Sequence, residues 1–356
     1  MTRPAPLAAV LAASLAVVLI ASACSDDSDS TGNEPAAITL ITHDSFALSE
    51  DTLPAFTEET GIEVEVLQAG DAGAALNQAV LTKDDPLGDV FFGVDNNLLS
   101  RAIDEDLFVP YESPELSHVP ERYQLDAGQN RVTPIDVADV CVNDDRTFFE
   151  GGDFEPPETL DDLADEDYRG LLVVEDPATS SPGLAFMLAT IAEYGEDGWL
   201  DYWEQLRAND VAVVAGWEEA YNGEFSAGEG NGDRPLVVSY ASSPPVAVYF
   251  EEPRPDESPV GVLLDTCFRQ IEFAGILSGT DHEAEAEQLV DFMLSKQYQE
   301  DLPLNQFVFP VRDDAELPGV FTKFAEVAEA PLELPADEIG ENRDRWIEEW
   351  RDTVLR

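Results

Sequence analysis

Basic residues are scarce in this chain of 356 residues. Lys and Arg number 18 against 75 Asp and Glu, which gives a formal net charge of -57 at pH 7. A surface of this charge repels nucleic acid and anionic membranes, so neither is an expected partner. The acidic residues are spread among apolar runs, which is typical of a folded protein with an acidic shell. A high-salt habitat that screens the repulsion, or simply an acidic secreted protein, would account for this composition.

Histidine is also rare. The three histidines, His43, His118 and His282, are far apart in the sequence and do not indicate a metal cluster. The chain lacks GxSxG, HExxH and Walker sequences, the usual signatures of serine hydrolases, zinc proteases and nucleoside triphosphatases. His43 and Asp44 resemble half of a hydrolytic site, but a surface pair at a strand end is the favoured interpretation. We therefore expect a protein that is not an enzyme and that uses no cofactor or metal.

Cysteine occurs three times, and the first cysteine ends a segment typical of an export signal. The apolar stretch over 7–20 leads into ASAC, whose last residue is Cys24. The stretch is short for a transmembrane anchor and ends like a lipoprotein cleavage site. We therefore expect a lipoprotein signal peptide over 1–23, a lipid on Cys24 and an acidic linker over 24–36. The protein is then anchored to the outer face of the cytoplasmic membrane.

The other two cysteines, Cys141 and Cys267, lie in the apolar runs ADVCVN and TCFRQIEF. An exported compartment permits a disulfide between them. Two buried free thiols are the alternative, and these residues by themselves leave the choice open.

Removal of the signal leaves about 320 residues, which is enough for two lobes. The first hundred alternate between strand and helix patterns, which is typical of a parallel sheet covered by helices. The predicted strands of this part are 38–42, 62–67 and 89–93, and the predicted helices are 49–60, 74–83 and 96–104.

A second α/β unit is predicted over 170–264, after a proline-rich extended region at 111–134. Its predicted strands read LLVVE, VAVVA, LVVSY and VGVLL. Two helical patterns follow, one over 283–298 and one at the C-terminus. In the latter, one apolar face is formed by Trp346, Ile347, Trp350 and Val354.

The segment 173–194 combines an apolar strand, a turn dense in hydroxyls and an apolar helix. Ser181 is a favourable N-cap and Pro182 a favourable first helical residue. The free N–H groups of that first turn, joined by Thr179 and Ser180, then face one point that suits a phosphate or another small anion. An ordinary capped helix is the simpler alternative.

Polar and aromatic residues follow nearly every predicted strand. Ligands of open parallel sheets bind beyond the carboxyl ends of the strands. Carboxylates, hydroxyls and flat rings at a shared cleft suit a small, partly aromatic ligand that carries both a cation and an anion. The candidate ligand-binding residues are His43, Asp44, Ser45, Asp71, Asp95, Thr179, Ser180, Ser181, Gly183, Trp217, Tyr221, Tyr240 and Ser242.

Six motifs, in this order and at these spacings, resemble those of the thiamine and thiamine-phosphate binding proteins of ABC importers. They are THDSFA, GDVFFGVDNNLL, DPATSSPG, GWEEAY, SYASSP and NQFVFPV. The resemblance covers nearly the whole mature chain and implies the type II periplasmic-binding fold. In this fold, two α/β lobes, each a mostly parallel sheet flanked by helices, are joined by two hinge strands. The implied division is 37–136 for lobe 1, 137–267 for lobe 2 and 268–356 for the return of the chain to lobe 1.

The resemblance also implies roles for individual residues. The turn 179–183 matches the turn that holds phosphate, and Asp71 matches an acidic cleft residue. Rings around the thiazolium and the pyrimidine are implied at Trp217, Tyr240 and Phe307. Core packing is the alternative for Trp217 and Phe307. The chain departs from the pattern at three positions: His43 replaces a frequent tyrosine, Phe307 replaces a tryptophan of some members, and Val246 replaces an aromatic residue that some members carry.

We therefore expect a lipid-anchored, monomeric binding protein that delivers thiamine or its phosphate esters to an ABC permease and its ATPase. Another small anion or iron is an alternative cargo. Iron binding in relatives of this fold usually needs paired tyrosines, whereas Tyr240 stands alone in its motif. An extracellular hydrolase is a distant alternative.

Overall fold

The computed structural model describes residues 36–151, 155–228 and 232–356. The predicted signal peptide, Cys24 and the linker up to residue 35 lie outside the described residues. The strands are β1 (Ala36–Thr42), β2 (Ile62–Gln68), β3 (Val90–Asp95), β4 (Phe108–Val109), β5 (Thr133–Asp145), β6 (Leu172–Glu175), β7 (Ala212–Val214), β8 (Leu236–Tyr240), β9 (Val260–Leu277) and β10 (Phe309–Pro310).

The helices alternate with these strands along most of the chain. The α-helices are α1 (Thr52–Thr60), α2 (Ala72–Leu81), α3 (Leu99–Asp104), α4 (Arg146–Glu150), α5 (Leu160–Leu163), α6 (Ser181–Tyr194), α7 (Trp199–Ala208), α8 (Val246–Tyr249), α9 (Glu283–Met293), α10 (Lys296–Asn305), α11 (Gly319–Phe324) and α12 (Ala336–Val354). The other helical turns are η1 (Pro114–His118), η2 (Glu121–Tyr123), η3 (Glu166–Tyr168) and the π-helix η4 (Glu218–Glu224).

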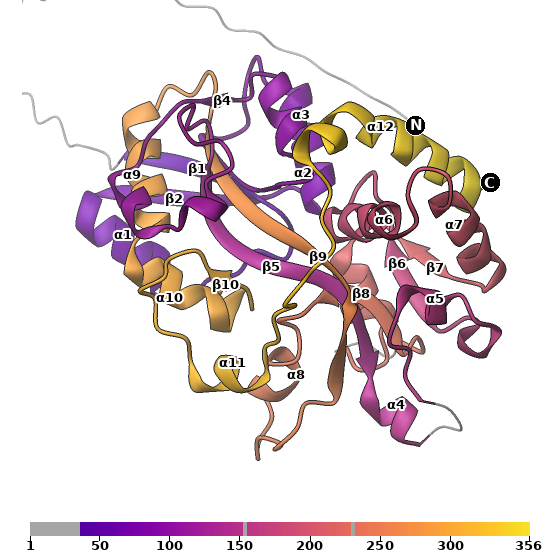
Figure 1. Cartoon of the computed structure of the whole chain (residues 1–356). Coiled ribbons are helices and arrows are strands. Elements are labelled where there is room, and N and C mark those ends of the chain that lie inside the picture. Colours follow the sequence, from indigo (N-terminus) through magenta and orange to yellow (C-terminus); the bar gives the residue numbers. More distant parts are fainter. Residues whose placement is uncertain (1–35, 152–154, 229–231) are drawn as a thin grey trace, which may run out of the picture. The chain divides into compact units, whose positions relative to one another are not determined.

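The strands form one sheet in the order β2-β1-β3-β9-β5-β8-β6-β7. The first three strands of this order are parallel to one another, as are the last three. Between the two groups, β9 and β5 pair antiparallel with their neighbours and with each other. Figure 1 shows β5 and β9 crossing side by side between the groups. We call the part around β1–β3 lobe 1 and the part around β6–β8 lobe 2. The predicted fold, two α/β lobes joined by two hinge strands, is confirmed.

One predicted strand is not a separate element. VGVLL was expected to belong to the parallel sheet of the second unit, but it forms the first part of β9 and pairs antiparallel with β5. No turn signal separates it from TCFRQIEF, so the chain stays extended across both lobes. The predicted boundaries at 136/137 and 267/268 fall inside β5 and β9, and the division at these positions stays a prediction.

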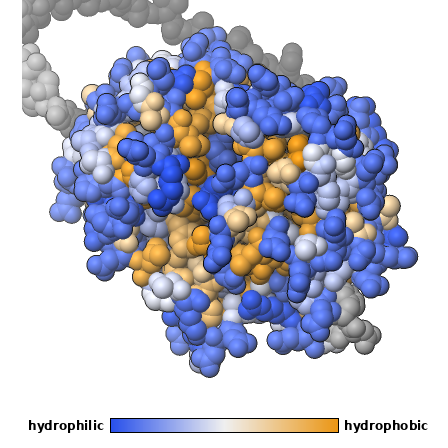
Figure 2. Space-filling model, viewed as in Figure 1, coloured by the Kyte–Doolittle hydropathy of each residue, from blue (hydrophilic) through white to orange (hydrophobic). Residues whose placement is uncertain are grey.

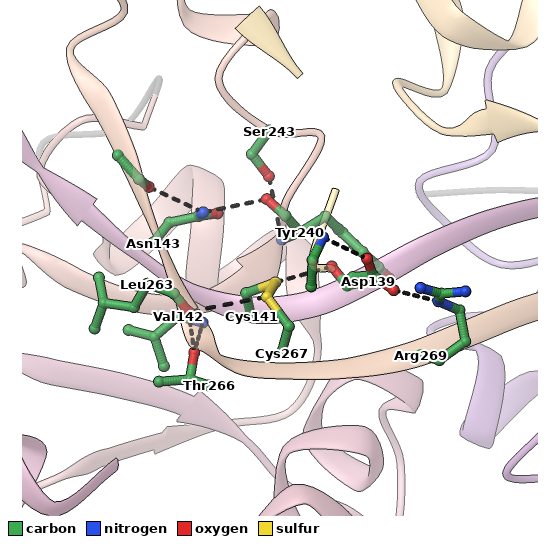
Figure 3. The surroundings of a disulfide bond; sticks show 12 residues. Asp139, Cys141, Val142, Asn143, Tyr240, Ser243, Leu263, Thr266, Cys267 and Arg269 are labelled. Atoms are coloured by element: carbon green, nitrogen blue, oxygen red, sulfur yellow. Dashed lines mark hydrogen bonds and ion pairs between the residues drawn. A yellow bond between two sulfur atoms is a disulfide. The ribbon is translucent and has the colours of Figure 1, made fainter. Parts of the chain in front are cut away.

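A disulfide joins the two hinge strands. Cys141 of β5 and Cys267 of β9 are fully buried, and their sulfur atoms are 2.00 Å apart (Figure 3). The pairing shifts register here, from Val140 opposite Phe268 to Val142 opposite Leu263. The irregular turn of β9 is held by Thr266, whose hydroxyl accepts a hydrogen bond from the Val142 N–H at 2.9 Å. The structure therefore confirms the disulfide and not the alternative of two free thiols.

The single helix predicted over 283–298 is two helices. Its first part, α9, ends at Met293, and α10 begins at Lys296. Ser295 is the N-cap of α10, and its hydroxyl accepts a hydrogen bond from the Tyr298 N–H at 3.2 Å. A serine at a position compatible with helix thus starts a new helix, because its side chain satisfies an N–H that has no intrahelical partner.

The C-terminal helix α12 buries the apolar face that its sequence predicts. Trp346 and Trp350 are fully buried, and the Trp350 ring lies 5.3 Å from that of Trp203 in α7. The Arg207 guanidinium of α7 also donates a hydrogen bond to the carbonyl oxygen of Thr353. The helix packs on α7 of lobe 2 and also contacts α3 of lobe 1, and the assignment of 268–356 to lobe 1 stays a prediction. Helical periodicity defines an apolar face but does not identify the element that covers it.

Apolar side chains gather in the middle of the face shown in Figure 2, and hydrophilic residues dominate its rim. The buried side chains form two large clusters, one spanning both lobes and one within lobe 1 under α1, α9 and α10. Within the described residues, no helix has both the length and the apolarity needed to cross a membrane.

Candidate functional site

A cavity of about 240 Å³ lies between the two lobes at the carboxyl ends of several strands. Its wall comes from the segment after β1, the start of α2, the start of α6, the residues after β7 and β8, and the loop between α10 and β10. The sequence predicted eight of its lining residues, namely His43, Ser45, Asp71, Ser181, Trp217, Tyr221, Tyr240 and Phe307. It did not predict Ala72, Pro182, Glu218, Asn222, Ser243, Val246, Phe250, Glu272, Asn305, Gln306 and Val308.

Asp71 connects the lobes across this cavity. It is the N-cap residue of α2, but its side chain makes no capping hydrogen bond to that helix. Its carboxylate instead accepts hydrogen bonds from the N–H groups of Ser181 and Trp217, each at 3.0 Å. Burial is the main cause that raises the pKa of Asp71, to about 6, against these hydrogen bonds, which lower it. A carboxylate of lobe 1 is thus held by two backbone donors of lobe 2.

The start of α6 differs by one residue from the sequence prediction. Ser180, not Ser181, is the N-cap, and its hydroxyl accepts a hydrogen bond from the Gly183 N–H at 3.4 Å. Helix ends are the least predictable boundaries, and two adjacent serines are equally suited to the role. Thr179 contributes its carbonyl oxygen to a 2.9 Å hydrogen bond from the Ala74 N–H of α2. The sequence offered the N–H of Ser181 to a bound anion. In the structure this N–H donates its hydrogen bond to a carboxylate of the protein itself, that of Asp71.

Several predicted residues support the cavity without lining it. Asp95 is fully buried and accepts hydrogen bonds from the Asn97 N–H at 3.0 Å and from the Ser181 hydroxyl. A Cβ on Gly183 would lie 2.6 Å from the Glu175 carbonyl oxygen, so only glycine lets α6 pack this closely. The other members of this group are the exposed Asp44, the half-buried Thr179, and the buried Ser180 and Ser242. Their contact with a ligand stays a prediction.

Three aromatic rings form one wall. Trp217 stacks on Tyr221 with ring centroids 5.0 Å apart and an angle of 14° between the ring planes. The ring centroid of Tyr240 lies 6.3 Å from that of Trp217, with 52° between the ring planes. The indole N–H of Trp217 donates to the Ser239 hydroxyl at 2.8 Å, which fixes the ring. The partly exposed rings of Trp217 and Tyr240 offer their faces to a flat or cationic ligand.

His43 is a neutral member of the lining. Burial lowers its pKa to about 4, so the imidazole ring is uncharged at neutral pH. Its Nδ1 lies 2.9 Å from the Ser45 hydroxyl. The surface pair with Asp44 that the sequence favoured is not formed, because His43 turns into the fold and packs against Phe92 at a ring distance of 5.6 Å.

Glu272 is the main acidic residue that sequence reasoning missed. It lies on β9 directly opposite Asp136 of β5, and both are buried. Burial raises the pKa of Glu272 well above its ordinary value and that of Asp136 to about 7, and the negative charge of Asp136 raises that of Glu272 further. The available signal was an acidic residue inside each strand-like run, Asp136 in IDVA and Glu272 in RQIEFA.

The electrostatics of the lining favour a cation. Asp71, Glu218 and Glu272 contribute carboxyl groups, and among the described residues that line the cavity none is Lys or Arg. In the part of the chain that the structure describes, no group of three or more His, Cys, Asp or Glu side chains is arranged to hold a metal ion. The site therefore combines acids and aromatic faces, which together suit an organic cation with flat rings.

Comparison with known proteins identifies the family to which this chain is similar. The family model described as bacterial extracellular solute-binding protein matches residues 85–326. The chain belongs to this family. Thiamine-binding periplasmic proteins are among its relatives: that of Salmonella typhimurium is 30% identical over 324 residues, 90% of this chain and 94% of that protein. That of Escherichia coli is 29% identical over the same shares of the two chains.

A solved structure described as a periplasmic thiamin binding protein matches this solute-binding protein with a TM-score of 0.78 and 26% identity. The match covers 90% of this chain and 96% of that chain. Ferric-binding proteins share the fold at only 16% to 18% identity, which supports no conclusion about cargo. The relatives are binding proteins and not enzymes, and the family acts outside the cytoplasm, in agreement with the sequence prediction.

Proposed function

We propose that this solute-binding protein captures thiamine or its phosphate esters outside the cytoplasm and delivers them to an ABC permease driven by its ATPase. One observation carries the proposal: the cavity between the lobes is lined by aromatic rings and carboxyl groups without a Lys or Arg among its described lining residues. The thiazolium of thiamine is a fixed cation in an aromatic ring. It therefore matches the faces of Trp217 and Tyr240 and the nearby carboxyl group of Asp71. Each cation–π contact with a ring contributes on the order of 1 kcal/mol when desolvated.

The two lobes supply the mechanism of capture. Asp71 comes from lobe 1, whereas Ser181 and Trp217 come from lobe 2, and all three line the cavity. A ligand held by both lobes makes all its contacts only when they are closed, so it shifts the open–closed equilibrium by its differential affinity. The closed form then presents both lobes to the permease together. The protein forms no covalent bond with its cargo and is proposed to act as a monomer.

Calorimetric titration of the purified mature chain with thiamine tests this function. We expect binding at pH 7.5 that weakens as the pH is lowered to 5. Asp71 has a pKa raised to about 6 by burial, so it loses the charge that attracts the cation as the pH falls through that value. Burial also raises the pKa of Glu272, so its carboxyl group likewise becomes neutral as the pH falls. His43 stays neutral over this range, because its pKa is lowered to about 4.

Thiamine monophosphate and pyrophosphate are the matched ligands in this titration. Since the described lining contains acids and no basic side chain, the added phosphates are expected to give no gain in affinity over thiamine. Absence of heat with all three compounds would refute the proposed cargo. Tighter binding of the pyrophosphate would instead support the turn at 179–183 as a phosphate site.

The lipid anchor is the second part of the proposal. Cys24 follows the apolar stretch and the small residues of the signal, but it lies outside the described residues. We expect mass spectrometry of the membrane fraction to find an acylated N-terminal cysteine. A soluble mature chain that begins at a residue other than Cys24 would show that the signal is of the ordinary secretory type.

A further inference from the structure

Asp136 and Glu272 form a pair of acids on the two hinge strands. They lie opposite each other in the pairing of β5 with β9, and they are only 1% and 8% exposed. Side chains at opposite positions of antiparallel neighbours stand on the same face, with Cβ atoms about 4.5 to 5.5 Å apart. Glu272 lines the cavity between the lobes, whereas Asp136 does not. A buried acid therefore lies directly beside an acid of the binding site.

No basic side chain faces this pair among the described residues. The groups whose charges act on it from other elements are acids and phenols, namely Asp71 at the start of α2, Asp95 at the end of β3, Tyr240 of β8 and Tyr298 of α10. Arg269, the one basic residue of β9, lies on the opposite face of the strand and pairs with Asp139. Neither carboxyl oxygen of Asp136 accepts a hydrogen bond from an N–H group, an alcohol or a phenol of the described chain. A negative charge on Asp136 therefore has no counter-charge.

This arrangement keeps a proton on the pair at neutral pH. Two carboxylates side by side in a buried place repel each other, so one of them stays protonated. Burial raises the pKa of Asp136 to about 7 and that of Glu272 well above its ordinary value. The charge of Asp136 raises the pKa of Glu272 further, so Glu272 is the acid that keeps the proton.

We propose that Asp136 holds Glu272 in its protonated form and thereby limits the affinity of the cavity for its cationic cargo. This inference rests on the proposed function. A cation that enters the cavity favours the ionised form of Glu272, so the carboxyl O–H bond breaks and the proton passes to the solvent. Return of the proton favours release of the cargo by the same linkage. Asp136 is a positioning residue, because it acts on the cargo through the charge of Glu272.

The affinity test compares wild type, Asp136→Asn, Glu272→Gln and the double variant by calorimetric titration with thiamine at pH 7. Asp136→Asn should bind about threefold to fivefold more tightly, because loss of the neighbouring charge lowers the pKa of Glu272. Glu272→Gln should bind about tenfold more weakly, because it cannot supply a charge to the cation. Asp136→Asn should give no gain in the Glu272→Gln background, since the two residues act as one unit. Damage to the fold would not produce a gain in affinity.

Proton release is the second measurement. Titration at pH 7 in phosphate and in Tris, two buffers with different enthalpies of ionisation, gives the number of protons released. The wild type should release about half a proton or more per thiamine, and both Asp136→Asn and Glu272→Gln should release fewer. Asp71 adds little at this pH, because its pKa of about 6 leaves it mostly ionised before the cargo binds.

Asp144→Asn is the matched control. Asp144 lies on the same strand as Asp136, is also buried and has a pKa raised to about 6 by burial, but it does not line the cavity or face Glu272. Its replacement should change neither the affinity nor the proton count. Equal or weaker binding by Asp136→Asn, or a wild type that releases no proton, would overturn the proposal. A wild type that does not bind thiamine would refute the proposed function instead.

Discussion

Asp71→Asn is expected to weaken thiamine binding on the order of a hundredfold, the largest effect of any single change in the cavity. The carboxylate accepts hydrogen bonds from the N–H groups of Ser181 and Trp217, which hold the wall of lobe 2 against lobe 1. An amide can accept only one of these hydrogen bonds, and its NH₂ group faces the other donor. Each hydrogen bond to a charged group is worth about 1.5 to 3 kcal/mol. The attraction of the carboxylate for the thiazolium is lost as well.

Titration calorimetry at pH 7.5 measures this effect, and Asp51→Asn is the matched control. Asp51 is also an N-cap residue whose side chain makes no capping hydrogen bond, but it is exposed and belongs to α1, away from the cavity. The Asp71→Asn variant should also show a shallower pH dependence of binding between pH 5 and 7. Equal affinities of the wild type and Asp71→Asn would mean that the carboxylate does not contribute to the site.

Replacement of Cys141 and Cys267 by alanine is expected to lower the free energy of unfolding by about 3 to 5 kcal/mol. The bond spans a sequence separation of 126 residues, and the chain-entropy model assigns values of this order to so long a loop. Its effect lies mainly in the unfolded chain, whose freedom the crosslink reduces. Alanine is chosen because both side chains are fully buried among apolar neighbours, where a serine hydroxyl would need a partner.

Urea denaturation of three samples checks this prediction: the double variant, the wild type with its disulfide intact and the reduced wild type. Reduction of the wild type should reproduce the loss seen in the double variant, because both remove the same crosslink. A titration of thiols in the unreduced, unfolded wild type should find none from these two positions. Two reactive thiols there would contradict the bond, and an unchanged unfolding free energy would contradict its contribution to stability.

Local patterns in the sequence determined much of the fold. The strands at 38–42, 62–67 and 89–93 and the helices between them were predicted close to their observed bounds. This succeeds because the alternation of apolar residues and the turn residue Gly61 are read within a few positions. The errors lie where two local signals compete. Ser180 and Ser181 are both suitable caps, and Ser295 divides a continuous helical pattern into α9 and α10.

The site was predicted in part for the same reason. Residues at or just after strand ends, such as Tyr240 and Trp217, were found because the carboxyl ends of parallel strands share one edge. Glu272 was missed because it lies within a strand, where the sequence indicates an apolar core. Phe250 was missed because its place depends on the path of the chain after α8, which no periodic pattern specifies.

The sequence by itself determined the acidic surface, the alternation of strands and helices in each lobe and the cysteines available for a crosslink, since these depend on composition and on residues close together in the chain. Only the tertiary structure decided which distant groups meet. It joined VGVLL and TCFRQIEF into β9, packed α12 on α7, set Glu272 opposite Asp136 and directed the Asp71 carboxylate away from its own helix to the start of α6. The last three contacts join residues about a hundred or more positions apart, so they depend on sheet order and helix packing, which local propensities do not encode.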